Sequence, residues 1–243
     1  DGMVYTHLRA GAESGWDFSS RWFDDTLHLN TIETTNTIPV DLNSLLYKYE
    51  TILSHAAKAS GKESLSKANA AKAEKRKQAL LKYCWDEEAE YFFDYDFKEK
   101  KVTGKWSLAG VMPLFCDAAT TDQAEAVKNR ISQKFLRDGG VVTTLYKTGQ
   151  QWDSPNGWAP LQFVTVKGLM NYGHHSLART IGERWMGMNE KVFKATGKMM
   201  EKYNVEDMSL QSGGGEYPNQ DGFGWTNGVY LIFHQMFKNK QGL

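Results

Sequence analysis

Three segments of the sequence combine carboxylates, tryptophans and glycines. They are residues 13–22 (ESGWDFSSRW), 150–160 (QQWDSPNGWAP) and 213–228 (GGGEYPNQDGFGWTNG). Five of the eight tryptophans lie in them: Trp16, Trp22, Trp152, Trp158 and Trp225. Aromatic rings beside acids are typical of a pocket for a sugar ring, whereas core tryptophans are usually spread along helix faces. One such segment alone could be a plain connector, but three together favour a carbohydrate site.

Two acids in these segments have environments that predict different protonation states. Asp17 stands between Trp16 and Phe18, and apolar surroundings favour a neutral carboxyl suited to a general acid. Glu216 follows a run of three glycines, whose backbone N–H groups can turn toward one anion and favour a general base. Hydrolysis of a glycosidic bond needs such a pair. Singly, Asp17 could also be a helix cap and Glu216 a solvated loop acid.

Two further acids compete with this pair. Asp153 precedes Ser154 and Pro155 ahead of an apolar stretch, so a cap or turn is its leading interpretation and binding of a sugar hydroxyl a lesser one. Asp221, in the sequence QDG, is typical of a turn.

The elements that must position these segments are predicted to be helices, which makes the chain all-α. Residues 39–60 carry a helical apolar period, and residues 63–83 are rich in strong helix formers. Further helices are expected at 107–118, 121–137, 158–172, 174–196 and 225–237. We expect a short hairpin or an irregular excursion at 91–102 and no helix at 1–11. The count is about seven.

Composition narrows the classes of partner. Lys plus Arg and Asp plus Glu each total 29 in 243 residues, so no basic surface for nucleic acid or anionic lipid is implied. No apolar run is long enough to span a membrane. The two cysteines, Cys84 and Cys116, are interpreted as buried thiols, and no metal site is predicted from the histidine spacing. We expect one domain over residues 1–243.

The three segments, together with TIPVDLNSLL at residues 37–46, resemble the C-terminal motifs of trehalases of glycoside hydrolase family 37. The resemblance runs from about Arg9 to Val229, and the QWDxPxGWAP element is a specific signature. It implies an (α/α)6 toroid that hydrolyses α,α-trehalose to two glucose molecules with inversion, without metal or cofactor. By motif position it makes Asp17 the general acid and Glu216 the general base. It also implies that Gly15 contacts the sugar and that the pocket wall contains Gln151, Trp152, Asp153, Trp158, Phe223 and Trp225.

One family feature is absent: a PGGRF-type segment with sugar-binding arginines. Since a ring of paired helices also needs an even number of them, we expect material N-terminal to Asp1 and a partial toroid here. The partners expected are a disaccharide substrate and either that N-terminal segment or another copy of the chain. Periplasmic and cytoplasmic locations both stay open.

Two alternative functions follow from the same observations. One is an inactive sugar-binding remnant; the other is a different (α/α)6 glycosidase or a disaccharide phosphorylase. A phosphorylase needs a phosphate site, yet apart from Arg21 no Arg or Lys cluster adjoins the three segments. For inversion, the carboxyl groups of Asp17 and Glu216 should lie about 6.5 to 9.5 Å apart. In a partial toroid, the 39–60 helix and the C-terminal helix should have exposed faces.

Overall fold

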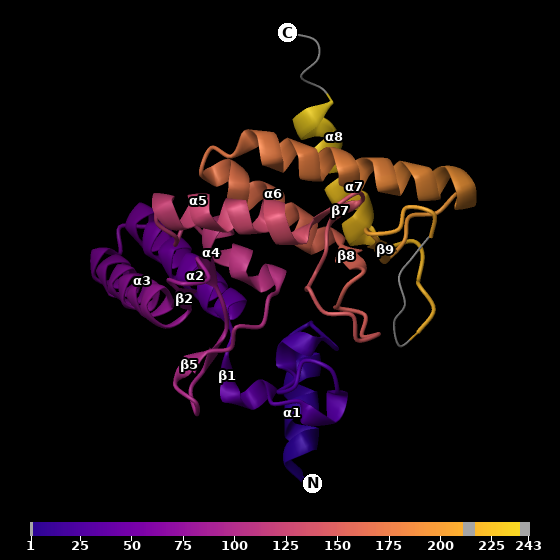
Figure 1. Cartoon of the computed structure of the whole chain (residues 1–243). Helices are drawn as coiled ribbons and strands as arrows, with labels where there is room; N and C mark the ends of the chain where they lie inside the picture. The colour runs from indigo at the N-terminus through magenta and orange to yellow at the C-terminus, as the bar shows by residue number, and fades with distance from the viewer. Residues whose placement is uncertain (1, 211–216, 239–243) are drawn as a thin grey trace.

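The computed structural model describes residues 2–210 and 217–238, and eight α-helices lie within these ranges (Figure 1). The helices are α1 (Gly2–Glu13), α2 (Val40–Ala59), α3 (Glu63–Tyr83), α4 (Met112–Phe115), α5 (Thr121–Arg130), α6 (Ala159–Asn171), α7 (His175–Thr196) and α8 (Gly224–Phe237). Shorter 3-10 turns are η1 (Ser20–Trp22), η2 (Leu29–Thr31), η3 (Thr34–Asn36) and η4 (Leu108–Val111), and η5 (Ile131–Phe135) is a π-helical turn. The all-α prediction is confirmed.

The long helices follow the predicted apolar periods, while three shorter regions differ. Helix α1 was not expected, because Val4, Tyr5 and Thr6 are weak helix formers and only His7 and Gly11 are buried on it. The predicted helix at 107–118 is a 3-10 turn followed by the short α4, with Pro113 in its first turn. The predicted helix at 121–137 ends early, because Leu136–Arg137 (β6) leave it to pair with Gly140–Val141 (β7).

Short strands connect the helices. The hairpin expected at 91–102 is present as β4 (Tyr95–Asp96) and β5 (Lys101–Val102), and β1 (Thr37–Ile38) adds to it. Trp85–Asp86 (β2) pairs with Tyr91–Phe92 (β3). For the site, the important pair is β8 (Asn156–Trp158) with β9 (Lys202–Asn204), since it joins two of the three motif-bearing regions.

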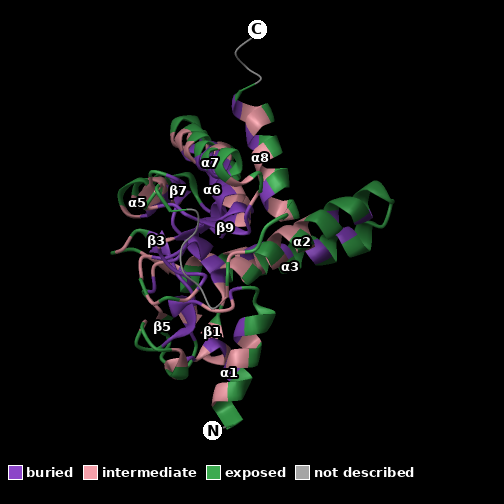
Figure 2. Ribbon diagram, turned by 90° about the vertical axis from the view of Figure 1, so that its right-hand side faces the viewer, coloured by how far each residue is buried: buried purple, intermediate pink, exposed green. Residues whose placement is uncertain are grey.

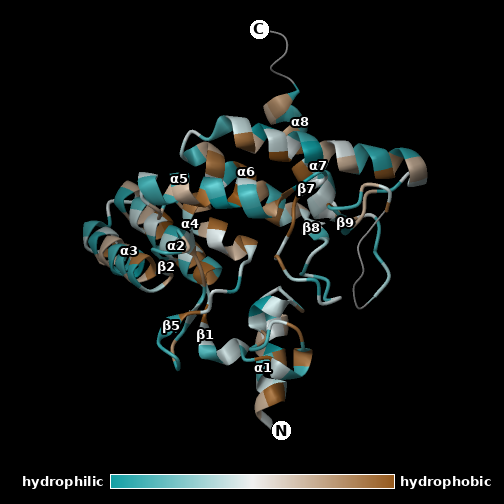
Figure 3. Cartoon of the chain, viewed as in Figure 1, coloured by the Kyte–Doolittle hydropathy of each residue, from teal (hydrophilic) through white to brown (hydrophobic). Residues whose placement is uncertain are grey.

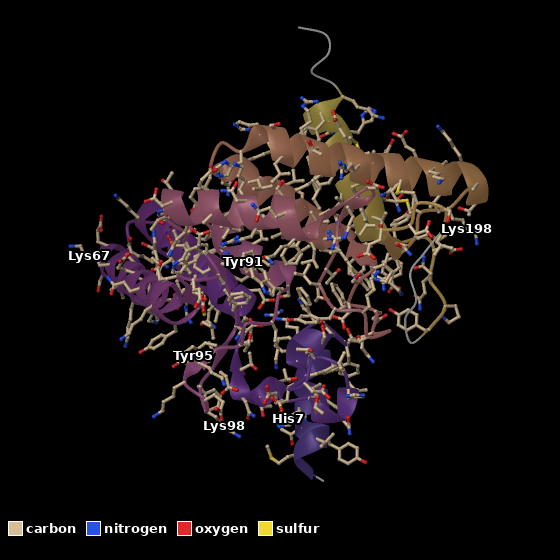
Figure 4. All side chains as sticks on the ribbon, in the orientation of Figure 1. His7, Lys67, Tyr91, Tyr95, Lys98 and Lys198 are labelled. Atoms are coloured by element: carbon tan, nitrogen blue, oxygen red, sulfur yellow. The ribbon has the colours of Figure 1, made fainter. Side chains whose placement is uncertain are left out.

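Helices α6, α7 and α8 pack on one another, α4 packs on α6, and α2 and α3 form a hairpin (Figure 1). One buried apolar cluster runs from Trp16 to Phe237. Apolar and polar residues alternate along α7 in Figure 3, and its buried positions include Ile181, Trp185, Met188 and Val192. In Figure 4, Tyr91 lies in the interior while Lys67 and Lys198 point outward on opposite sides. Cys84 and Cys116 are unpaired and buried, as predicted.

The α2–α3 hairpin projects from the rest of the molecule (Figure 2). Helix α2 therefore exposes apolar side chains that a globular core would cover, namely Leu42, Leu45, Tyr49 and Ile52, each about half accessible. On α8, Leu231 and Ile232 are exposed as well. The expectation of exposed faces on these two helices is confirmed.

Candidate active site

The first two motifs lie side by side, residue against residue. The Gln151 side chain donates to the carbonyl oxygen of Asp17. The backbone N–H of Trp152 donates to the carbonyl oxygen of Phe18 over 3.1 Å. The carboxylate of Asp153 accepts from Ser19 and Ser20. Residues 151–153 thus hold residues 17–20 in register, although 134 positions separate Ser19 from Asp153 in the sequence.

Asp153 is completely buried, and its two oxygens accept hydrogen bonds from hydroxyl and backbone donors. The Ser19 hydroxyl lies at 2.8 Å, the Ser20 hydroxyl at 2.7 Å, the Ser20 N–H at 2.9 Å and the Thr144 hydroxyl at 2.9 Å, and the Thr148 hydroxyl completes the set. Burial raises the pKa of Asp153, and these hydrogen bonds oppose the rise. Helix α6 begins without a side-chain cap. The cap interpretation of Asp153 is therefore wrong, because its carboxylate turns to the first motif instead.

An aromatic ladder joins all three motifs. The rings of Trp16 and Trp152 lie 5.3 Å apart, and Trp152 stacks on Trp158 at 3.9 Å with an interplanar angle of 2°. Trp158 meets Trp225 edge-on at 5.7 Å, and Trp225 lies 5.0 Å from Phe223. Asp17 directly follows Trp16, the first ring of this ladder, and is half-buried.

Arg21 joins the first motif to two carboxylates outside it. Its guanidinium is 1% exposed, lies 4.6 Å from the Trp16 ring and 4.3 Å from the Trp22 ring, and donates two hydrogen bonds each to Asp41 and Asp94. Burial alone would lower the pKa of Arg21, but the two carboxylates raise it above its ordinary value. The Arg21 guanidinium is thus fully engaged by these two carboxylates and is not available to bind a phosphate.

A second buried ion pair supports the third motif. Lys202 and Glu201 are paired at 2.8 Å, and the ammonium of Lys202 lies 5.2 Å from the Trp158 ring and 4.4 Å from the Tyr217 ring. The Tyr217 hydroxyl donates to Glu201 over 2.8 Å. Burial, the hydrogen bond to Glu201, and the charges of Glu201 and Asp17 raise the pKa of Tyr217. Tyr217 therefore lies within electrostatic reach of Asp17.

Most of the predicted site residues converge. Gln151 contacts Asp17 directly, Asp153 contacts Ser19 and Ser20, and the successive ring contacts of Trp152, Trp158, Trp225 and Phe223 lead to Trp16, the neighbour of Asp17. Gly15 is exposed with φ of +78°, so a side chain there would be strained. Glu216 lies outside the described residues, and its separation from Asp17 stays a prediction. Asp221 pairs with Lys198 at the surface.

Sequence reasoning missed two supports of the site, the Arg21–Asp41–Asp94 cluster and the Glu201–Lys202 pair. Asp41 stands in the TIPVDLNSLL segment, which carried a signal, but neither Asp94 nor the adjacent Glu201 and Lys202 differ by pattern from surface charges. Within residues 2–210 and 217–238, no group of three or more His, Cys, Asp or Glu side chains is arranged to hold a metal ion. In the same ranges, no helix is both long and apolar enough to cross a membrane.

Known proteins are similar to this chain in sequence over nearly its whole length. A periplasmic trehalase of Xanthomonas oryzae pv. oryzae is 47% identical over 237 residues, which cover 98% of this chain and 41% of that protein. A periplasmic trehalase of Pseudomonas aeruginosa is 46% identical, covering 97% of this chain and 43% of that protein. The chain thus spans about two fifths of the length of these curated relatives.

Solved structures agree with the sequence relatives. A neutral trehalase from Saccharomyces cerevisiae superposes with a TM-score of 0.80 at 29% identity, over 96% of this chain and 42% of that one. A mannosylglycerate hydrolase from Thermus thermophilus, at 18% identity and a TM-score of 0.63 over 82% of this chain and 48% of that one, shares the fold. The helix pairs are therefore part of an (α/α)6 toroid. Because the family model described as Trehalase matches residues 1–238, motifs and wall included, this chain belongs to the trehalase family.

Proposed function

We propose that the chain supplies the acid and base of an inverting trehalose hydrolase, which cleaves the α,α-1,1 bond to give two glucose molecules. The observation that carries the proposal is the aromatic ladder, which links three distant motifs beside the half-buried Asp17. The family membership supports the same substrate. All described elements would then belong to one catalytic domain.

In this mechanism Asp17 protonates the glycosidic oxygen as the bond breaks. Glu216 accepts a proton from a water molecule that attacks the anomeric carbon from the opposite face. In this mechanism the ladder of Trp16, Trp152 and Trp158, whose rings are largely buried against one another, forms an apolar wall beside the sugar ring. In this proposal the exposed backbone at Gly15 and the Gln151 side chain, which donates to the carbonyl oxygen of Asp17, bind sugar hydroxyl groups. Phe223 and Trp225 extend the same wall.

The first experiment is a product assay on the protein expressed from its complete gene. Trehalose should yield glucose, and NMR at early times should show α- and β-glucose in equal amounts, because inversion changes only one of the two anomeric centres. Maltose is the control substrate. Two α-glucose molecules would contradict inversion, glucose 1-phosphate formed with phosphate would indicate a phosphorylase, and trehalose binding without turnover would indicate a remnant.

The second experiment distinguishes the roles of the two carboxylates by comparing substrates that differ in their leaving group. Asp17→Asn should lower kcat/KM for trehalose by roughly two to four orders of magnitude and lower that for α-glucosyl fluoride much less, because fluoride departs with little acid help. Glu216→Gln should reduce both, since water must be activated in either case. Asp221→Asn is the matched control, because its carboxylate pairs with Lys198 at the surface. A fluoride substrate that rescued Glu216→Gln but not Asp17→Asn would reverse the two roles.

We further propose a periplasmic location. The names of the Xanthomonas and Pseudomonas relatives support it. Osmotic-shock fractionation of the native host tests it, and retention of the protein in spheroplasts would contradict it.

A further inference from the structure

We infer that Asp153 is a positioning residue that fixes the general acid Asp17, rather than a ligand of the sugar; the inference rests on the function proposed above. The resemblance places Asp153 in a motif of the pocket wall, so sugar binding was one of its expected roles, beside a cap or turn. Its surroundings in the structure point to a different one. Both of its oxygens are occupied by protein donors, and none of its surface is accessible.

The donors come from both sides of the proposed site. Ser19 and Ser20 stand two and three residues after Asp17, while Thr144 and Thr148 belong to the segment that leads into the second motif. On the other side of Asp153, the Gln151 side chain holds the carbonyl oxygen of Asp17 itself. The backbone of Asp17 is therefore held by hydrogen bonds at its own carbonyl group and at the two serines that follow. Because consecutive Cα atoms are about 3.8 Å apart, Asp17 lies within a few ångströms of these fixed points, and a large shift of its backbone requires these contacts to open.

A carboxylate suits this position better than an amide of the same shape. Oδ1 faces the hydroxyls of Ser19, Ser20 and Thr144, and Oδ2 faces the hydroxyl of Thr148, while the backbone N–H of Ser20 donates to both oxygens, at 3.1 and 2.9 Å. Hydroxyl groups can rotate to become acceptors, but a backbone N–H cannot. An asparagine with its NH2 at the Oδ2 position would direct a donor at the Ser20 N–H. The turned amide would direct its NH2 at the three hydroxyls and again at the Ser20 N–H, which also donates to Oδ1.

Displacement of a general acid has a specific kinetic signature. It weakens proton transfer to the leaving group, and a misplacement of about 1 Å can reduce the rate by about 100-fold. Asp153→Asn should therefore lower kcat for trehalose by about 100-fold, with KM changed less than about threefold. For α-glucosyl fluoride the loss should stay below about tenfold, because that leaving group needs little acid.

Matched variants separate this role from general damage. Asp96→Asn removes another buried carboxylate that accepts loop N–H groups, from Lys98 and Glu99, but it lies in the β4–β5 hairpin. It should not discriminate between the two substrates. Should Asp153→Asn fail to fold, Thr148→Val removes only one donor to Asp153 and should show the same selectivity with a smaller loss. Its control is Thr165→Val, which removes a buried hydroxyl within α6.

All variants are made in the protein expressed from the complete gene, and Asp17→Asn is assayed in parallel as the reference for loss of the general acid. Selective loss on trehalose in Asp153→Asn and in Asp17→Asn supports the inference. Equal loss on both substrates, or a loss confined to KM, in Asp153→Asn or in Thr148→Val overturns it, even while Asp17→Asn keeps its selectivity. If Asp17→Asn itself shows no selectivity, the proposed function fails and the inference with it.

Discussion

At the scale of single residues, Arg21 shows how a charged side chain can be buried when carboxylates and aromatic rings surround it. Its guanidinium lies between the rings of Trp16 and Trp22 while its N–H groups meet both Asp41 and Asp94 at 2.7 to 2.8 Å. A planar fork that binds two carboxylates and stacks on indoles is specific to arginine, because lysine carries a single compact ammonium. Asp94 also accepts the N–H of Val40 at the start of α2, so the cluster ties the first motif to a helix.

Arg21→Lys should therefore reduce the free energy of unfolding by roughly 3 kcal/mol, since at least one of the four hydrogen bonds disappears and the compact ammonium cannot reach both carboxylates with the geometry of the guanidinium. Urea denaturation followed by circular dichroism measures the change. Arg9→Lys is the control, because the Arg9–Glu13 pair is exposed and should change stability by less than about 0.5 kcal/mol. Equal effects of the two substitutions would show that the buried cluster adds no stability.

At the scale of elements, Glu206 holds the second motif against the segment after β9. It pairs with Arg137 at 3.1 Å and Lys147 at 2.6 Å and accepts from Ser154, the neighbour of Asp153, at 2.9 Å. Burial acts to raise the pKa of Glu206, but the hydrogen bonds from Lys147, Ser154 and Arg137 outweigh it and lower the pKa below its ordinary value. The ionised form is thus the one that stabilises the loop.

This lowered pKa predicts a pH-dependent contribution to stability. It should be fully present above the ordinary glutamate pKa of about 4.5 and be lost as the pH falls through the lower pKa of the folded state. Glu206→Gln should therefore destabilise the protein by about 1 to 2 kcal/mol at about pH 7 and by much less at about pH 3. Glu99→Gln serves as the control, because the Glu99–Lys101 pair is exposed at 3.9 Å. A pH-independent deficit would argue against an ionic role.

Elements with a local signal could be predicted from the sequence, and those set by distant partners could not. The apolar periods of α2, α6, α7 and α8 gave their ranges to within a few residues. The end of α5 was missed because β6 leaves the helix to pair with β7. In the site, Asp17 and the tryptophans stood out by type, but the partners of Asp153 lie up to 134 positions away and leave no trace in neighbouring residues. Glu201 and Lys202 are buried by packing, which composition does not reveal.

At the scale of the whole molecule, α2 exposes apolar side chains to water, which is unfavourable in free energy. Leu42, Leu45, Tyr49 and Ile52 recur at helical spacing on the projecting hairpin (Figure 2). Contiguous exposed apolar patches of this kind promote association between molecules.

Leu45→Lys should therefore lower self-association of the 243-residue chain, measured by light scattering over a concentration series. It should change the free energy of unfolding by less than about 0.5 kcal/mol, because the side chain is exposed. Lys58→Glu, on the same helix but away from this face, is the control. A large loss of stability in Leu45→Lys would mean that the leucine packs within the molecule.

The alignment of residues 17–20 with residues 151–153 also has a consequence for the order of folding. Contacts between residues 134 positions apart require a long loop to close, and the chain loses conformational entropy in closing it before any of these contacts can stabilise the fold. The α2–α3 hairpin and the α6–α7 pair are built from neighbours in the sequence and can form early. We expect the indole stack of Trp152 on Trp158 to reach its final environment only after the N-terminal segment has arrived. Stopped-flow tryptophan fluorescence should then lag behind the helical circular dichroism signal during refolding. The helices would thus form before the contacts that assemble the proposed active site.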